Sequence, residues 1–145
     1  MRRLLLVHGP NLNMLGKRDV SHYGARTLSA IEELVAAEAR KNGFEVASFQ
    51  SNHEGALIDW MQKESKDAEG IIINPGALTH YSYALHDALV DTGLLAVEVH
   101  LSDIGAREEW RKNSVTVAAC IGQISGKKEA GYVEALTMLL EKLRH

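Results

Sequence analysis

Short apolar runs alternate with amphipathic stretches along the chain. Each run has the length of a strand, and a run that is apolar at successive positions is typical of a strand buried on both faces. The sequence predicts strands at residues 4–7, 44–49, 70–73, 95–99 and 115–121. It predicts helices at residues 28–39, around residues 54–61, and at residues 80–92 and 129–143, with a short helical piece at residues 107–111.

This alternation of strands and helices predicts one fold class. Parallel strands need crossover connections, and helices in those connections cover both faces of the sheet. We therefore expect an α/β fold, a flavodoxin-like three-layer sandwich with a five-stranded parallel sheet, formed by residues 1–145 as a single catalytic domain. In such folds a ligand binds beyond the carboxyl ends of the strands, near the point where the strand order reverses.

Composition narrows the classes of function. The chain has 145 residues and a net charge of -3, which offers no basic field for nucleic acid. No apolar run approaches the length that crosses a membrane, and the run after Arg2 and Arg3 is too short for a signal peptide. The lone Cys120 cannot form a disulfide within the chain. We expect a cytoplasmic protein with no nucleic-acid or membrane partner.

Polar side chains follow every predicted strand. Because the carboxyl ends of parallel strands meet at one edge of the sheet, we expect these side chains to gather there. Four of the seven histidines are among them, which makes the pattern more specific than ordinary loop polarity. In chain order the residues are His8, Asn11, Asn13, Gln50, Asn52, His53, Asn74, Thr79, His80, Ser82, His100, Ser102, Gln123 and Ser125.

The fourth predicted strand carries a candidate acid–base pair. Glu98, His100 and Ser102 alternate, so in an extended chain they point to one side. A glutamate in a central parallel strand is costly unless it is paired, and Glu98 could hold and orient His100 for acid–base chemistry. The alternative is a strand that ends at the surface with a solvated histidine.

A second candidate group lies in the polar segment between Gly16 and Gly24. This segment lacks apolar periodicity, which is typical of a mobile loop that can close over a site. It contains Tyr23, and because free tyrosine has a pKa of about 10 it is a poor base at neutral pH. A guanidinium within about 4–6 Å, such as that of Arg18, favours the phenolate. The alternative is that both are ordinary surface side chains.

Two arginines allow a further interpretation. Arg107 and Arg111 are four positions apart and share one face of the predicted helical piece. They could form a bidentate clamp for a carboxylate or phosphate, or they could be solvated partners of Glu108 and Glu109.

Two further positions concern an anion or a metal. His80 opens the predicted helix at residues 80–92, where main-chain N–H groups favour an anion, and Asp87 lies two turns along the same face and by itself indicates only a solvated carboxylate. His80, His100 and Glu98 could in principle bind zinc or iron. No metal-binding spacing of histidines supports this alternative, so no metal is expected.

Five sequence blocks carry a family resemblance. They are GPNLNMLGKRDVSHYG, QSNHEG, INPGALTHYSYALHDAL, VEVHLSD and AREEWRKNS. In this order, and over nearly the whole chain, they closely resemble the type II 3-dehydroquinate dehydratases of the shikimate pathway. The resemblance implies a flavodoxin-like subunit, a homo-oligomer that is a dodecamer of trimers, and no cofactor. It also implies that water is removed from 3-dehydroquinate to give 3-dehydroshikimate through an enolate.

The resemblance implies a role for each catalytic position. Tyr23 would be the base that takes the proton next to the ketone. Arg18 would favour its phenolate and stabilise the charged transition state. His100 would be the acid that protonates the departing hydroxyl, with Glu98 behind it. Asn11 would position the water that stabilises the enolate oxygen.

Other family positions imply contacts with the substrate. Asp87 would reach the site of a neighbouring subunit, and Arg107 belongs to the motif but is assigned no direct contact. The residues that would bind the hydroxyls and the carboxylate of the substrate are Asn74, His80, Leu101, Ser102 and Arg111.

A few positions differ from the usual family pattern. His8 stands where an asparagine is common, and residues 17–20 replace a more usual Arg-Glu-Pro core. None of the differences removes a catalytic role. The principal alternative function is a flavodoxin-like module that binds a small anion without catalytic activity, since fold does not fix function.

Overall fold

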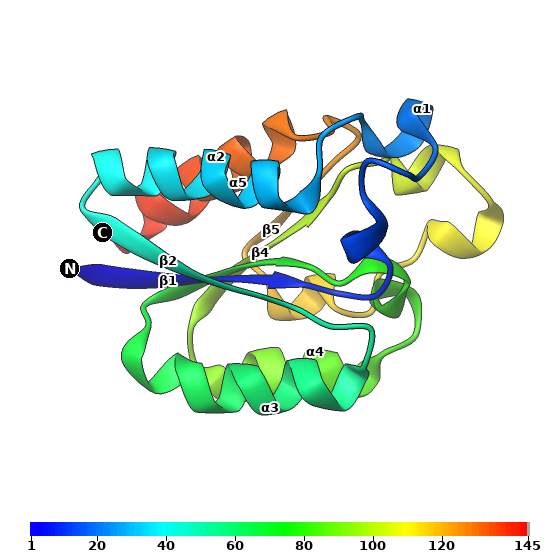
Figure 1. The fold of residues 1–145 in the computed structure, drawn as a ribbon. Coiled ribbons are helices and arrows are strands. Elements are labelled where there is room, and N and C mark those ends of the chain that lie inside the picture. Colours follow the sequence, from blue (N-terminus) through cyan, green and yellow to red (C-terminus); the bar gives the residue numbers. More distant parts are fainter. Residues whose placement is uncertain (145) are drawn as a thin grey trace.

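The computed structural model describes residues 1–144, and a five-stranded parallel sheet forms its centre (Figure 1). The strands lie in the order β2-β1-β3-β4-β5, and the order reverses between β1 and β3. This is the flavodoxin-like arrangement, so the predicted fold class is confirmed. The strands are β1 (Arg2–His8), β2 (Phe44–Gln50), β3 (Gly70–Asn74), β4 (Leu95–His100) and β5 (Gly122–Ser125).

Two long helices cover each face of the sheet (Figure 1). Those on one face are α2 (Leu28–Lys41) and α5 (Ala130–Leu143), and those on the other are α3 (Glu54–Glu64) and α4 (Tyr83–Thr92). No helix within residues 1–144 is both long enough and apolar enough to cross a membrane.

The interior strand β1 contributes side chains to both hydrophobic cores. Successive side chains of a strand point to opposite faces, so Leu4 and Leu6 pack with α2 and α5, whereas Leu5 and Val7 pack with α3 and α4. All four side chains are fully buried. Burial of such a side chain contributes about 1.5–3 kcal/mol, so this strand anchors the segment that follows it.

Short helical turns follow the carboxyl ends of the strands. Figure 1 shows α1 and its neighbouring loops at the end of the sheet opposite to the two termini. Of the polar residues that the sequence places after the strands, Asn13, Thr79 and His80 lie within these turns, and the others lie at strand ends or in the adjoining loops. The turns are η1 (Leu12–Met14), α1 (Val20–Tyr23), η3 (Gly76–His80), η4 (Ile104–Ala106), η5 (Glu109–Arg111) and η6 (Val117–Ala119), while η2 (Ser65–Asp67) precedes β3 at the other edge.

Two glycines let the segments after β1 and β3 approach each other closely. Gly9 donates its N–H to the carbonyl of Asn74 at 2.7 Å, and a Cβ at Gly9 would lie 2.1 Å from the carbonyl oxygen of Pro75. Gly76 has a φ of +61°, and its Cβ would lie 2.9 Å from the carbonyl oxygen of Pro10. Only glycine fits both positions, which fixes where the two segments meet.

The fifth predicted strand is wrong in its position. The apolar run at residues 115–121 contains the turn η6, and β5 begins only at Gly122. The hydroxyl of Ser114 accepts the N–H of Val117 at 3.1 Å, and the side chain of Thr116 is fully buried. These polar side chains give the backbone hydrogen bonds that favour a turn over pairing with a strand of the sheet. Residues 115–121 therefore leave the extended conformation.

The predicted helix at residues 80–92 also begins later than expected. α4 starts at Tyr83, because the side chain of Ser82 accepts the N–H of Leu85 at 3.0 Å and caps the helix. His80 therefore belongs to the preceding turn η3 and is not at a helix start.

The predicted helical piece at residues 107–111 forms only in its second half, as the turn η5 (Glu109–Arg111). η4 ends before Arg107, which has an extended backbone, and η5 ends at Arg111. The two arginines therefore do not share a helix face.

Candidate active site

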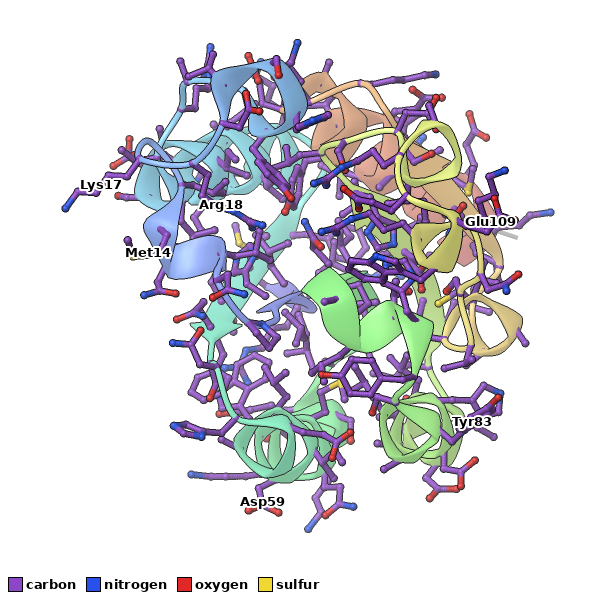
Figure 2. The ribbon with its side chains drawn as sticks, turned by 90° about the vertical axis from the view of Figure 1, so that its right-hand side faces the viewer. Met14, Lys17, Arg18, Asp59, Tyr83 and Glu109 are labelled. Atoms are coloured by element: carbon purple, nitrogen blue, oxygen red, sulfur yellow. The ribbon has the colours of Figure 1, made fainter. Side chains whose placement is uncertain are left out.

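A pocket opens at the carboxyl edge of the sheet. It encloses about 540 Å³, including the open space at its mouth. Figure 2 looks onto this edge, with the side chain of Arg18 turned toward the middle of the molecule and that of Lys17 pointing away. The lining residues are Pro10, Asn11, Leu12, Arg18, Tyr23, Asn74, Gly76, Ala77, His80, His100, Leu101, Ser102, Ile104, Arg107 and Arg111.

Strand β4 holds the Glu98–His100 pair that the sequence predicts. His100 Nε2 lies 2.9 Å from Oε2 of Glu98. Glu98 is fully buried, and His100 is 5% exposed, so the alternative of a solvated surface histidine is wrong. Because Nε2 is engaged by the carboxylate, Nδ1 is the ring nitrogen that remains for the pocket.

Hydrogen-bond donors surround the carboxylate of Glu98. Gln123 Nε2 donates at 2.6 Å from the neighbouring strand, Ser114 Oγ donates at 2.9 Å, and the hydroxyl of Thr116 also donates. Burial opposes ionisation, but the hydrogen bonds, that from His100 above all, lower the pKa of Glu98 to about 2. Glu98 is therefore a negative charge behind His100 at neutral pH.

Tyr23 ends the short helix α1 and contacts two arginines. Its hydroxyl oxygen accepts a hydrogen bond from Arg107 Nη1 at 2.7 Å. The Cζ atom of Arg18 lies 3.7 Å from the centre of the Tyr23 ring, which is a close cation–π contact. Asp19 caps α1 by accepting the N–H of Ser21 at 2.9 Å. One guanidinium thus bonds the hydroxyl, and a second covers the ring.

Positive charge is concentrated on this part of the pocket. Burial, together with the charges of Arg107 and Arg111, lowers the pKa of Arg18 below its ordinary value. A guanidinium nevertheless stays protonated in proteins. Three such groups around one pocket favour an anion as its ligand.

His80 and Arg111 line the pocket from η3 and η5. His80 Nδ1 lies 2.6 Å from the carbonyl oxygen of Asn113, which can only accept, so Nε2 is left as the acceptor of the ring. Burial lowers the pKa of His80, which favours this neutral form. Arg111 pairs with Glu108 and lies over the ring of Trp110, with its Cζ 4.1 Å from the ring centre. Arg111 thus has the predicted carboxylate partner and still lines the pocket.

Two asparagines come from the loops after β1 and β3. Asn11 has a φ of 71°, in the left-handed region, and its main-chain N–H donates to the side chain of Asn52 at 2.9 Å. Asn74 Nδ2 donates to the hydroxyl of Tyr132 at 3.0 Å, and its Oδ1 accepts the N–H of Gly76 at 3.1 Å. The amide of Asn74 is therefore fixed in orientation, with one N–H hydrogen left for the pocket.

Nearly all the predicted site residues come together at this pocket. Of the eleven, nine line it, and Glu98 lies directly behind His100. Asp87 is the exception. It lies on α4 with its side chain 76% exposed, where it contacts His86 at 3.1 Å. Because its predicted role concerns a neighbouring subunit, that role stays a prediction.

Arg107 is the residue that sequence reasoning missed. The family resemblance assigns it no direct contact, and the residue pattern offers only an anion clamp with Arg111. The structure instead gives Arg107 hydrogen bonds to Tyr23 at 2.7 Å and to the hydroxyl of Ser102 at 3.2 Å. Its spacing from Arg111 was the available signal, but a helix would have turned both arginines to one face. Because the backbone at Arg107 is extended instead, its side chain reaches Tyr23, which is 84 positions away in the sequence.

The pocket residues do not form a metal site. Within residues 1–144 no group of three or more His, Cys, Asp or Glu side chains could hold a metal ion. The donors that converge are guanidinium, amide and hydroxyl groups, which suit a polar anion.

Comparisons with known proteins identify one family. The family model described as dehydroquinase class II matches residues 2–140. A 3-dehydroquinate dehydratase of Bacillus mycoides (strain KBAB4) is 53% identical over 144 residues, which is 99% of each chain. The crystal structure of a type II dehydroquinase from Butyrivibrio crossotus DSM 2876 has a TM-score of 0.92 at 42% identity, and covers 96% of this chain and 97% of that chain. The type II dehydroquinase from Propionibacterium acnes also has a TM-score of 0.92, at 35% identity, with 97% of both chains covered.

Proposed function

The chain belongs to the class II dehydroquinase family, and from this premise we propose that it removes water from 3-dehydroquinate to give 3-dehydroshikimate through an enolate. Such a dehydratase is a carbon–oxygen lyase. One observation carries the proposed mechanism: a tyrosine hydroxyl bonded by a guanidinium and a glutamate-backed imidazole line the same pocket. These two groups divide the work of base and acid.

Tyr23 is the base. The charges of Arg107 at its oxygen and of Arg18 over its ring favour the phenolate. The phenolate oxygen takes the proton next to the ketone, and the electron pair of the broken C–H bond moves to the ketone oxygen. The enolate that forms needs a hydrogen-bond donor at this oxygen, and Asn11 supplies it by positioning a water molecule.

His100 is the acid. Hydroxide is a poor leaving group, so the departing hydroxyl must be protonated as its bond to carbon breaks. Nε2–H of the ring donates to the ionised Glu98, and the proton on Nδ1 is given to the hydroxyl. The enolate electrons then form the new double bond, and water leaves. Tyr23 loses its proton and His100 regains one before the next turnover.

The remaining pocket residues bind the substrate. Arg111 offers a guanidinium to the carboxylate, while His80 offers a ring acceptor and Asn74 an amide N–H to the hydroxyls. Leu101 and Ser102 complete this surface. We also propose that Asp87 reaches the pocket of a neighbouring subunit in a dodecamer of trimers, which gives this exposed carboxylate a partner.

A module that binds a small anion without catalysis is less favoured. Anion binding alone requires the arginines, but it does not require a buried carboxylate behind a pocket imidazole. The Glu98–His100 arrangement is costly to bury and is explained by acid–base chemistry.

The ultraviolet absorbance of the conjugated enone tests the proposal. Purified protein mixed with 3-dehydroquinate is expected to produce the absorbance of 3-dehydroshikimate, and size-exclusion chromatography with light scattering is expected to report a dodecamer. Folded, assembled protein that binds the substrate without producing the enone would favour the binding module instead.

A further inference from the structure

A buried polar layer lies behind Asn74 and has no part in the proposed chemistry. His8, at the end of β1, is fully buried and pairs with Asn74 in the register of β1 and β3. The ring of Tyr132, from α5, is also fully buried, and its centre lies 6.2 Å from that of His8. Glu32, from α2, is half-buried, with Oε2 3.2 Å from His8 Nε2. Three elements thus bring their polar groups to one histidine.

The hydroxyl of Tyr132 has a hydrogen that needs an acceptor. Its oxygen accepts from Asn74 Nδ2 at 3.0 Å, and burial raises the pKa of Tyr132, so the phenol keeps its proton. Buried polar groups are almost always paired. Within residues 1–144, the buried side-chain nitrogens and oxygens that make no hydrogen bond are Nε of Arg107 and both ring nitrogens of His8, although Nε2 lies close to the Glu32 carboxylate. Of these two residues, His8 is the one whose ring packs against Tyr132.

We propose that His8 is a positioning residue that fixes the amide of Asn74 through Tyr132. In this arrangement His8 Nε2–H faces Glu32, and Nδ1 accepts the hydroxyl hydrogen of Tyr132 once the ring turns toward it. The phenol oxygen is then free only to accept, and Asn74 must present Nδ2 to it.

This series of hydrogen bonds prevents the Asn74 amide from rotating by 180°. A rotation of 180° would exchange donor and acceptor, so Nδ2 would meet the N–H of Gly76 and Oδ1 would meet the oxygen of Tyr132. With Tyr132 held as an acceptor by His8, both new contacts are repulsive. The second N–H of Asn74 therefore stays aimed at the pocket. This inference rests on the proposed function, in which Asn74 contacts the substrate, but the state of His8 can be measured without turnover.

Nitrogen NMR of histidine-labelled protein without substrate tests the proposed hydrogen bond between Tyr132 and His8. The His8 signals are assigned by their loss in His8→Asn. We expect a hydrogen on Nε2 and none on Nδ1, and we expect the Nδ1 resonance to move toward that of a free acceptor in Tyr132→Phe. A ring with hydrogen on Nδ1, or an Nδ1 resonance that Tyr132→Phe leaves unchanged, would overturn the proposal whatever the enzyme's activity.

Steady-state kinetics test the link to Asn74. His8→Leu removes the acceptor and is expected to raise KM about tenfold, with kcat changed less than about threefold, which corresponds to the loss of one oriented hydrogen bond. His8→Asn, whose amide can accept and donate, is expected to restore KM. Thermal unfolding of both variants serves as the control for a purely structural role. An unchanged KM in His8→Leu, or equal KM values for the two variants, contradicts the positioning role. A wild-type protein that forms no enone refutes the proposed function and leaves the NMR result to decide this inference.

Discussion

The two sides of the pocket are built in different ways. His100 stands on β4 inside the sheet, and its partner Glu98 takes hydrogen bonds from a neighbouring strand and from the segment before η6. Tyr23 ends a helix of four residues, none of which is buried. Its main polar contacts are the side chains of Arg18 and Arg107.

His100 is thus a preorganised group, whereas Tyr23 is held mainly by nearby charges. Hydrogen bonds buried in the sheet fix the imidazole before any ligand arrives. The tyrosine, by contrast, lies on a segment with few buried contacts, which is typical of the least stable parts of a fold. The two arginines that contact its hydroxyl and its ring also hold it in place. Substitutions on the two sides should therefore fail in different ways.

The largest effect is expected from Tyr23→Phe. The change removes the hydroxyl but keeps the ring under Arg18, so the substrate should still bind. We expect kcat to fall by about a thousandfold, in the range that a lost general base produces, with KM changed only a few-fold. Enone formation gives kcat, and circular dichroism with thermal unfolding checks the fold. Near-normal turnover would remove Tyr23 from the base role.

On the opposite side, Glu98 should couple stability to pH. Its pKa is about 2 in the folded protein against an ordinary 4.5, so the unfolded chain binds the proton more readily. The stability that this carboxylate contributes is complete above about pH 4.5 and is lost as pH falls toward 2, up to about 3 kcal/mol. Urea unfolding should show that the difference in free energy of unfolding between wild type and Glu98→Gln narrows between pH 6 and pH 3. A difference that does not depend on pH would contradict this prediction.

Arg107→Lys tests whether charge or hydrogen-bond geometry holds Tyr23, the proposed base. Lysine keeps the charge but lacks the planar guanidinium, whose Nη1 donates to both Tyr23 and Ser102. We expect kcat to fall about a hundredfold, as for the loss of one donor to a developing charge. Arg26→Lys, at a half-exposed arginine that pairs with Glu129, is the matched control and should leave kcat unchanged. Equal kcat values for the two variants would show that the bond to Tyr23 is dispensable.

The smallest effect concerns the backbone that carries Tyr23. Gly24 has a φ of +78° and a ψ of 177°, a region that only glycine enters readily. A Cβ there would lie 3.0 Å from Oε2 of Glu129. Gly24→Ala should therefore displace the tyrosine and lower kcat/KM about tenfold, from a strain of about 1–3 kcal/mol. Gly43→Ala introduces similar backbone strain at a φ of +84° with nothing nearby. It should reduce the melting temperature without lowering kcat/KM.

The sequence predicted the sheet side of the site well because its signals are local. Apolar runs such as residues 70–73 mark buried strands, and alternation of Glu98 and His100 places both on one side whatever the surrounding fold. The carboxyl edge then collects polar residues from several strands, which is a property of parallel sheets in general.

Contacts between distant segments were beyond the sequence patterns. The run at residues 115–121 resembles a strand, but the hydroxyl of Thr116 bonds Glu98 and the chain turns there. Arg107 reaches Tyr23 only because its backbone is extended between two turns. Asp87 does not line the pocket at the carboxyl edge of the sheet, so its predicted role depends on how subunits are arranged.

The division of labour between Tyr23 and His100 is tested most directly by separating proton exchange from dehydration. Proton NMR of 3-dehydroquinate in D₂O follows both reactions at once. His100→Gln keeps the base but lacks the acid, so deuterium should enter next to the ketone faster than 3-dehydroshikimate forms. Tyr23→Phe should slow both reactions by about a thousandfold. Deuterium entering at the wild-type rate in Tyr23→Phe would contradict the assignment of the phenolate as the base.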